Sequence, residues 1–139
     1  MDILKLVKNL NFPQSEFLII GGAAMAIRKI KETKDIDILV SKDLLEQLKK
    51  DTTWNYHSRI VVTEESGLIN NDKTIELYPT IANDTLTFSE LKANQEIIGT
   101  VPVACLNDVL RIKEFYHREK DLKDIELIKL YLNAREGSN

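Results

Sequence analysis

The sequence contains few of the residues that build disulfide-bonded, zinc-binding or membrane-spanning proteins. Its 139 residues include one cysteine, Cys105, so neither an internal disulfide nor a zinc cluster is expected. No apolar run approaches the roughly 18 residues of a membrane span, and the start at Met1 lacks the basic-then-apolar pattern of a secretion signal. The single thiol predicts a reducing, cytoplasmic location, and the lack of a signal pattern and of a long apolar run predicts no membrane partner.

The sequence also lacks a strong excess of one charge. The net charge is −3, so no basic field over the whole molecule attracts nucleic acid, although a local patch that binds RNA stays open. The remaining composition, 43% hydrophobic and 29% charged, is that of an ordinary globular protein. A chain of this length buries about two-thirds of its unfolded surface, so residues 1–139 are expected to form one domain.

Hydrophobic periodicity predicts alternating helices and strands. Helical spacing predicts an N-terminal helix within residues 1–12 and a C-terminal pair of helices within residues 106–132. Further strands are expected at residues 17–20, 35–40, 59–63, 74–78 and 97–103, and short helices at 23–30 and 43–48. This order predicts an α/β, or α+β, fold with a small mixed sheet flanked by helices.

Several local expectations accompany these elements. Gly67 and the following Asn70-Asn71-Asp72 predict turns, and Pro102 predicts an edge strand because proline cannot donate to a ladder. Caps are expected at Ser41 and Asn107. Leu122 is expected to face the core, and residues 133–139 are expected to fray.

The most informative segment is Asp35-Ile36-Asp37-Ile38-Leu39-Val40. Alternation places Asp35 and Asp37 on one face of a strand, with their Cα atoms roughly 7 Å apart. Two carboxylates this close repel, and a divalent cation such as Mg²⁺ relieves that repulsion and also binds phosphates. Glu76, between apolar residues of a later strand, is the candidate third carboxylate. Two ions in such a site stabilise the attacking and leaving oxygens of phosphoryl transfer.

Gly21-Gly22 follows the apolar run at residues 17–20. Glycine permits close approach of a ligand to the backbone, and the following helix start presents N–H groups to an anion such as a triphosphate. Each signal also has an ordinary alternative. A lone Asp-x-Asp is commonly an exposed strand face, Gly-Gly is usually a turn, and Glu76 is also compatible with a solvent-facing strand position. Their combination favours a metal and nucleotide site.

Gly21-Gly22, Asp35-x-Asp37 and the later Glu76 resemble the motif of the nucleotidyltransferase superfamily, the fold of DNA polymerase β and of minimal bacterial nucleotidyltransferases. The chain is most similar to abortive-infection and toxin–antitoxin nucleotidyltransferases, through Lys31-Glu32-Thr33-Lys34 before the aspartates and two later segments. These segments are Leu110-Arg111-Ile112-Lys113 and Arg118-Glu119-Lys120-Asp121-Leu122-Lys123-Asp124. The resemblance covers about residues 17–130, and Glu76 stands where the family more often has aspartate.

The resemblance implies Mg²⁺- or Mn²⁺-dependent transfer of a nucleoside monophosphate from an NTP such as ATP to a hydroxyl of RNA, a protein or a small molecule. It implies Asp35, Asp37 and Glu76 as metal ligands, with Glu76 also orienting or deprotonating the acceptor. The implied nucleotide-binding residues are Gly21, Gly22, Lys31, Thr33, Lys113 and Lys120. A protein partner such as an antitoxin is also implied.

Three alternatives stay open at this point. For Lys113 and Lys120 a solvated helix face is the more usual position of lysine, and Asp121 and Asp124 are also compatible with an exposed face or a cap at the second helix. The chain as a whole is also compatible with an inactive module that keeps the fold and binds a nucleotide or a partner protein. A structural protein whose Asp-x-Asp is an exposed face is the third possibility.

Overall fold

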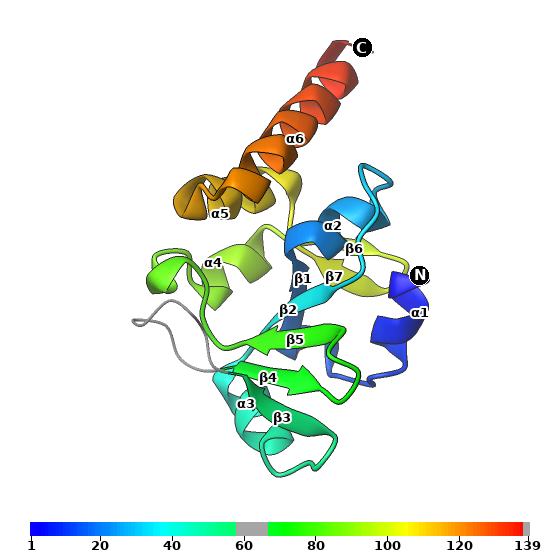
Figure 1. The fold of residues 1–139 in the computed structure, drawn as a ribbon, viewed down its shortest axis with the longest axis vertical. Helices are drawn as coiled ribbons and strands as arrows, with labels where there is room; N and C mark the ends of the chain where they lie inside the picture. Colours follow the sequence, from blue (N-terminus) through cyan, green and yellow to red (C-terminus); the bar gives the residue numbers. More distant parts are fainter. Residues whose placement is uncertain (58–66, 138–139) are drawn as a thin grey trace.

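The computed structural model describes residues 1–57 and 67–137 (Figure 1). Its helices are α1 (Ile3–Lys8), α2 (Gly21–Ile27), α3 (Lys42–Leu48), α4 (Phe88–Ala93), α5 (Leu106–Tyr116) and α6 (Glu119–Gly137). Its strands are β1 (Phe17–Ile20), β2 (Ile36–Val40), β3 (Trp54–His57), β4 (Gly67–Asn70), β5 (Ile75–Tyr78), β6 (Glu96–Ile98) and β7 (Val101–Val103). Short 3₁₀ turns, η1 (Gln14–Glu16) and η2 (Ala82–Asp84), precede β1 and α4.

The described strands form one mixed sheet in the order β3-β4-β5-β2-β1-β7-β6. The central strand β2 pairs antiparallel with β1 and parallel with β5. Helices flank this sheet, and Figure 1 shows α5 and α6 together on one side, with α6 extending away from the body. The predicted mixed α/β fold with helices around a small mixed sheet is therefore confirmed.

The core lies around the two central strands. All four residues of β1 are buried, and Ile36, Ile38 and Leu77 of the adjacent strands are fully buried as well. A strand that is covered on both faces reads as a continuous apolar run, and Phe17-Leu18-Ile19-Ile20 has this pattern. Helix α2 packs on β1 and β2 and also contacts α5, which links the sheet to the C-terminal helices.

The helices at both ends of the chain differ in length from those predicted. Helix α1 stops at Lys8, with Asn9 as its C-cap, so it covers only part of residues 1–12. Helix α6 continues to Gly137, so the expectation that residues 133–137 fray is wrong. Leu122 is 47% exposed because the buried face of α6 begins instead with Asp121 and Asp124, four and one residues before Ile125.

Caps and strand ends also differ in part from the predictions. Ser41 caps α3 by accepting a hydrogen bond from the Leu44 amide at 3.1 Å, as predicted. Asn107 is not a cap, because α5 already begins at Leu106 and Cys105 is the N-cap residue. Residues 97–103 form the β6–β7 hairpin, and β6 rather than the strand with Pro102 lies at the sheet edge.

One side of the sheet was only partly predicted. The strand expected at residues 59–63 lies outside the described residues. Gly67, expected in a turn, begins β4, which pairs with β3 and β5. A Cβ at Gly67 would lie 2.1 Å from the Leu77 carbonyl oxygen, so glycine is needed there for close strand approach rather than for a turn.

In the two described ranges, no helix combines the length and apolar character required to cross a membrane.

We expect Gly67→Ala to destabilise the protein by about 1–3 kcal/mol, because the added methyl overlaps backbone that cannot move away as a side chain would. Urea unfolding measures this change, and Ser89→Ala, at an exposed position on α4, is the control expected to stay within about 0.5 kcal/mol of the wild type. Equal stability of the two variants would contradict this packing of β4 on β5.

Candidate functional site

The pairing of β2 with β5 brings the predicted carboxylates together. Asp37 and Glu76 are register partners on these parallel strands. They therefore lie side by side on neighbouring strands, which in a sheet are about 4.8 Å apart. Because side chains alternate along a strand, Tyr78 lies on the same face as Glu76. Ile36 and Ile38, which flank Asp37, are fully buried and anchor the strand from the opposite face.

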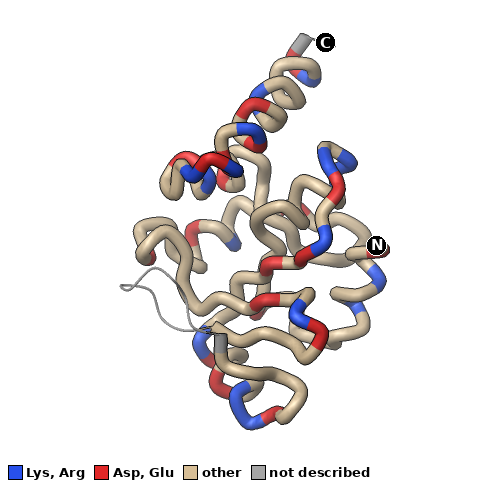
Figure 2. Tube along the Cα trace, viewed as in Figure 1, with Lys and Arg blue, Asp and Glu red and all other residues tan. Residues whose placement is uncertain are grey.

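These carboxylates line a cleft of about 440 Å³ between the sheet and helices α5 and α6. All of the predicted site residues line this cleft: Gly21, Gly22, Lys31, Thr33, Asp35, Asp37, Glu76, Lys113 and Lys120. Figure 2 shows acidic positions at the starts of β2 and β5, opposite mixed basic and acidic positions on α5 and α6. Residues far apart in the sequence therefore meet around one space.

Gly21 fits closely against Asp37 at the junction of β1 and α2. Its φ is +63°, in the left-handed region that favours glycine. A Cβ at this position would lie 3.1 Å from Asp37 Oδ2. Gly22 is less constrained, because its Cβ would meet Thr33 Oγ1 at 3.3 Å and the flexible Lys31 side chain at 3.4 Å. The absence of a side chain at Gly21 thus leaves room for the Asp37 carboxylate.

The surroundings of Asp37 disfavour its ionised form. Burial, followed by the nearby carboxylates of Glu76 and Asp35, raises the pKa of Asp37 from 3.8 to about 6. A hydrogen bond from Tyr78 and the charge of Lys113 act in the opposite direction without cancelling this rise. Near neutral pH the cleft therefore holds closely spaced negative charge, which a bound cation would stabilise.

The Tyr78 hydroxyl lies between two of these carboxylates. It donates a hydrogen bond to Glu76 Oε2 at 2.6 Å, and it lies 3.4 Å from Asp37 Oδ1. Residue-by-residue alternation was enough to place Tyr78 beside Glu76, but its part in the site was not predicted. Tyr116 and Arg118, which also line the cleft, were missed as well, because their positions depend on how α5 packs.

A network of ion pairs forms the opposite wall. Both oxygens of Asp124 accept hydrogen bonds from Lys31 Nζ, at 2.9 and 3.0 Å, and Asp124 Oδ2 lies 2.8 Å from Lys113 Nζ. The side chains of Lys113 and Asp124 are only 9% and 10% exposed. Burial alone would raise the pKa of Asp124, but the hydrogen bonds from Lys113 and Lys31 hold it below the ordinary value.

Asp121 continues this network toward the start of α6. Its carboxylate is fully buried and accepts hydrogen bonds from the Arg118 backbone N–H at 3.0 Å and from Arg118 Nε at 2.8 Å. Asp121 is the third residue of α6, and a side chain at that position that accepts from the N-cap N–H forms half of a capping box. Of the two interpretations of Asp121, an exposed face or a cap, the cap is therefore correct. The solvated-face reading is wrong for Asp121, Asp124 and Lys113, all of which are buried. Lys120 stays exposed at the cleft.

The donor set has the chemistry that suits Mg²⁺ or Mn²⁺, since three carboxylates line one cleft and hard cations prefer oxygen ligands. In the side-chain arrangement described for residues 1–57 and 67–137, however, no three His, Cys, Asp or Glu side chains are grouped tightly enough to hold an ion. Asp35 is exposed, and the Glu76 carboxylate is engaged by Tyr78. Ligation by all three would therefore need side-chain rotation.

Comparison with known proteins adds no assignment: no family model and no curated protein matches the chain.

We expect Asp37→Asn to be more stable than the wild type at pH 8 in metal-free buffer, by about 1–3 kcal/mol. Between about pH 4 and pH 6 the folded protein keeps a proton on Asp37 that the unfolded chain has already lost, so wild-type stability falls as the pH rises through this window. The advantage of the variant should therefore shrink toward pH 4. Urea unfolding at both pH values measures it, with the exposed Asp72→Asn as control. A constant difference across this range would contradict the prediction.

We also expect Gly21→Ala to cost about 1–2 kcal/mol, the usual penalty for a side chain in the left-handed region, and to weaken any ligand binding at Asp37. Gly22→Ala is the matched control, because Gly22 lacks the left-handed φ of Gly21. Thermal unfolding of the two variants tests this, and a smaller loss for Gly21→Ala than for Gly22→Ala would be inconsistent with the crowding described.

Proposed function

We propose that the protein is a divalent-metal-dependent nucleotidyltransferase with the fold of the DNA polymerase β-like superfamily. The observation that carries the proposal is the meeting of Asp35, Asp37 and Glu76 with Lys113 and other basic residues around one cleft. The cleft volume, about 440 Å³, is in the range of small-molecule sites. A nucleoside triphosphate is a ligand that needs both kinds of residue, carboxylates to bind its metal ions and cations to bind its phosphates.

Within this proposal the acidic wall, formed by Asp35, Asp37 and Glu76, would hold Mg²⁺ or Mn²⁺, which would supply charge stabilisation at the phosphates. The shared face of Asp37 and Glu76 is the main support, because it concentrates negative charge that burial makes costly. Asp35 lies at the cleft rim and would complete the ligand set by rotating inward. Glu76 would orient the acceptor hydroxyl or accept its proton.

The basic wall would hold the triphosphate. Lys120 is exposed at the cleft and is available to a phosphate. Lys31 and Lys113 are held by Asp124, so a triphosphate would have to share these ammonium groups with that carboxylate. Each Lys has three donors, which allows a phosphate oxygen and Asp124 to be bound together. The acceptor would be a hydroxyl of RNA, of a protein or of a small molecule.

A second function, a nucleotide-binding module without turnover, is favoured by one specific observation. In the part of the chain that the structure describes, no three potential ligands are close enough to bind an ion as they stand. If Asp35 does not rotate inward, the cleft would still bind a nucleotide through its basic wall. Such a module would act through a bound nucleotide or a partner protein, such as the antitoxin of a toxin–antitoxin pair.

The experiment that separates these functions measures NTP binding by calorimetry and pyrophosphate release with Mg²⁺ and a panel of hydroxyl acceptors. For an enzyme we expect Asp37→Asn to reduce pyrophosphate release at least about 100-fold, since a metal ion contributes several kcal/mol to such a transition state. Asp72→Asn, an exposed carboxylate outside the cleft, is the matched control. An NTP affinity that is unchanged by Asp37→Asn and by removal of the metal would favour the module. Absence of any NTP binding would contradict both functions.

A further inference from the structure

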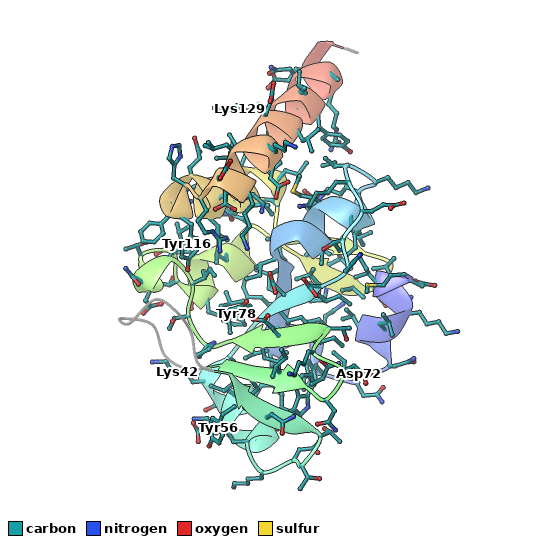
Figure 3. All side chains as sticks on the ribbon, viewed as in Figure 1. Lys42, Tyr56, Asp72, Tyr78, Tyr116 and Lys129 are labelled. Atoms are coloured by element: carbon teal, nitrogen blue, oxygen red, sulfur yellow. The ribbon has the colours of Figure 1, made fainter. Side chains whose placement is uncertain are left out.

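The hydroxyl of Tyr78 lines the cleft and has no role in the proposed function, and its surroundings are those of an acceptor. It donates to Glu76 Oε2 at 2.6 Å and lies 3.4 Å from Asp37 Oδ1. In the proposed reaction, the acceptor hydroxyl must sit beside these same two carboxylates, with Glu76 taking its proton. Tyr78 is labelled in Figure 3, where it comes from β5 near the centre of the molecule.

We propose that Tyr78 is itself a nucleotidylation site, so that the protein attaches a nucleoside monophosphate to its own phenol. This inference rests on the proposed function and names one acceptor for it. In the reaction, the phenolic oxygen attacks the α-phosphorus of the NTP and a phosphorus–oxygen bond to Tyr78 forms. The bond from the α-phosphorus to the oxygen that bridges to the β-phosphate breaks, pyrophosphate leaves, and the phenolic proton passes to Glu76. No oxidant or reductant is involved.

The position of Tyr78 favours this reaction over attack by a free hydroxyl from solution. Its backbone is fixed in the sheet by pairing with Leu39, which is 1% exposed, so little freedom remains for the chain carrying the phenol. A nucleophile held in place in this way saves much of the entropy cost of a bimolecular encounter. An adjacent general base is one way in which a weak hydroxyl nucleophile is activated, and the Glu76 carboxylate lies in that position beside the phenol.

The other described tyrosines fit this role less well. The Tyr116 hydroxyl lines the same cleft but accepts a hydrogen bond from the Ala82 backbone N–H at 3.0 Å, which directs it toward η2. Tyr56 is 71% exposed on β3, and Tyr131 lies on α6 beside Arg135. Tyr78 is thus the tyrosine whose recorded partners include both Glu76 and Asp37.

The test is the intact mass of the purified chain before and after incubation with Mg²⁺ and each NTP in turn, followed by peptide mapping, with pyrophosphate release measured in the same samples. We expect a gain of one nucleoside monophosphate per chain, located on Tyr78, and loss of the label to background in Tyr78→Phe. Tyr56→Phe, the same chemical change at an exposed site, should label as the wild type does. Calorimetry should show that Tyr78→Phe still binds NTP, which separates a lost acceptor from a lost site.

The outcomes distinguish the inference from the function beneath it. Pyrophosphate release with the label on another residue or only on an added acceptor would overturn the role of Tyr78 and leave the nucleotidyltransferase proposal standing. NTP binding without pyrophosphate release would overturn both the inference and catalysis in favour of the binding module. Mapping on the wild type decides the site independently, even if Tyr78→Phe fails to fold.

Discussion

The parallel pairing of β2 with β5 is the constraint on which the candidate site depends. It places Asp37 beside Glu76, and the burial of Ile36, Ile38 and Leu77 on these strands prevents the two carboxylates from moving apart. The resulting repulsion and burial raise the pKa of Asp37 to about 6. The buried apolar side chains of the sheet thus hold Asp37 and Glu76 close together although their charges repel, and such an arrangement is typical of functional sites.

The ion-pair network on the other wall balances this acidic surface. Lys113 of α5 lies between the sheet and the buried aspartates of α6, and Asp124 reaches across to Lys31 in the α2–β2 connection. Buried ion pairs of this kind add little net stability, so their main effect is to position side chains. They keep two ammonium groups at the cleft, and they tie the C-terminal helices to the segment that leads into β2.

The carboxylates between these walls have more than one candidate partner. In the structure, the Tyr78 hydroxyl donates a hydrogen bond to one oxygen of Glu76 and approaches Asp37. A cation bound by the same carboxylates would have to share or displace this contact, because each carboxylate oxygen has a limited number of acceptor sites. The proposed metal site and the proposed self-modification site are therefore coupled through Glu76.

Local patterns in the sequence determined the strand phase of the carboxylates and the Gly-Gly junction, because period-2 alternation and glycine geometry act over a few residues. The cleft lysines were expected only from the resemblance of the sequence motifs, and Tyr116 and Arg118 were not expected at all. Nothing local revealed that Gly67 belongs to a strand, since its need for glycine comes from the backbone of β5. The same holds for Asp124, whose partner Lys31 is 93 residues away, and for Leu122, which faces solvent because charged residues take the buried face of α6. These features depend on long-range packing and on pairing of buried charges, and only the tertiary structure decides which distant groups come within reach.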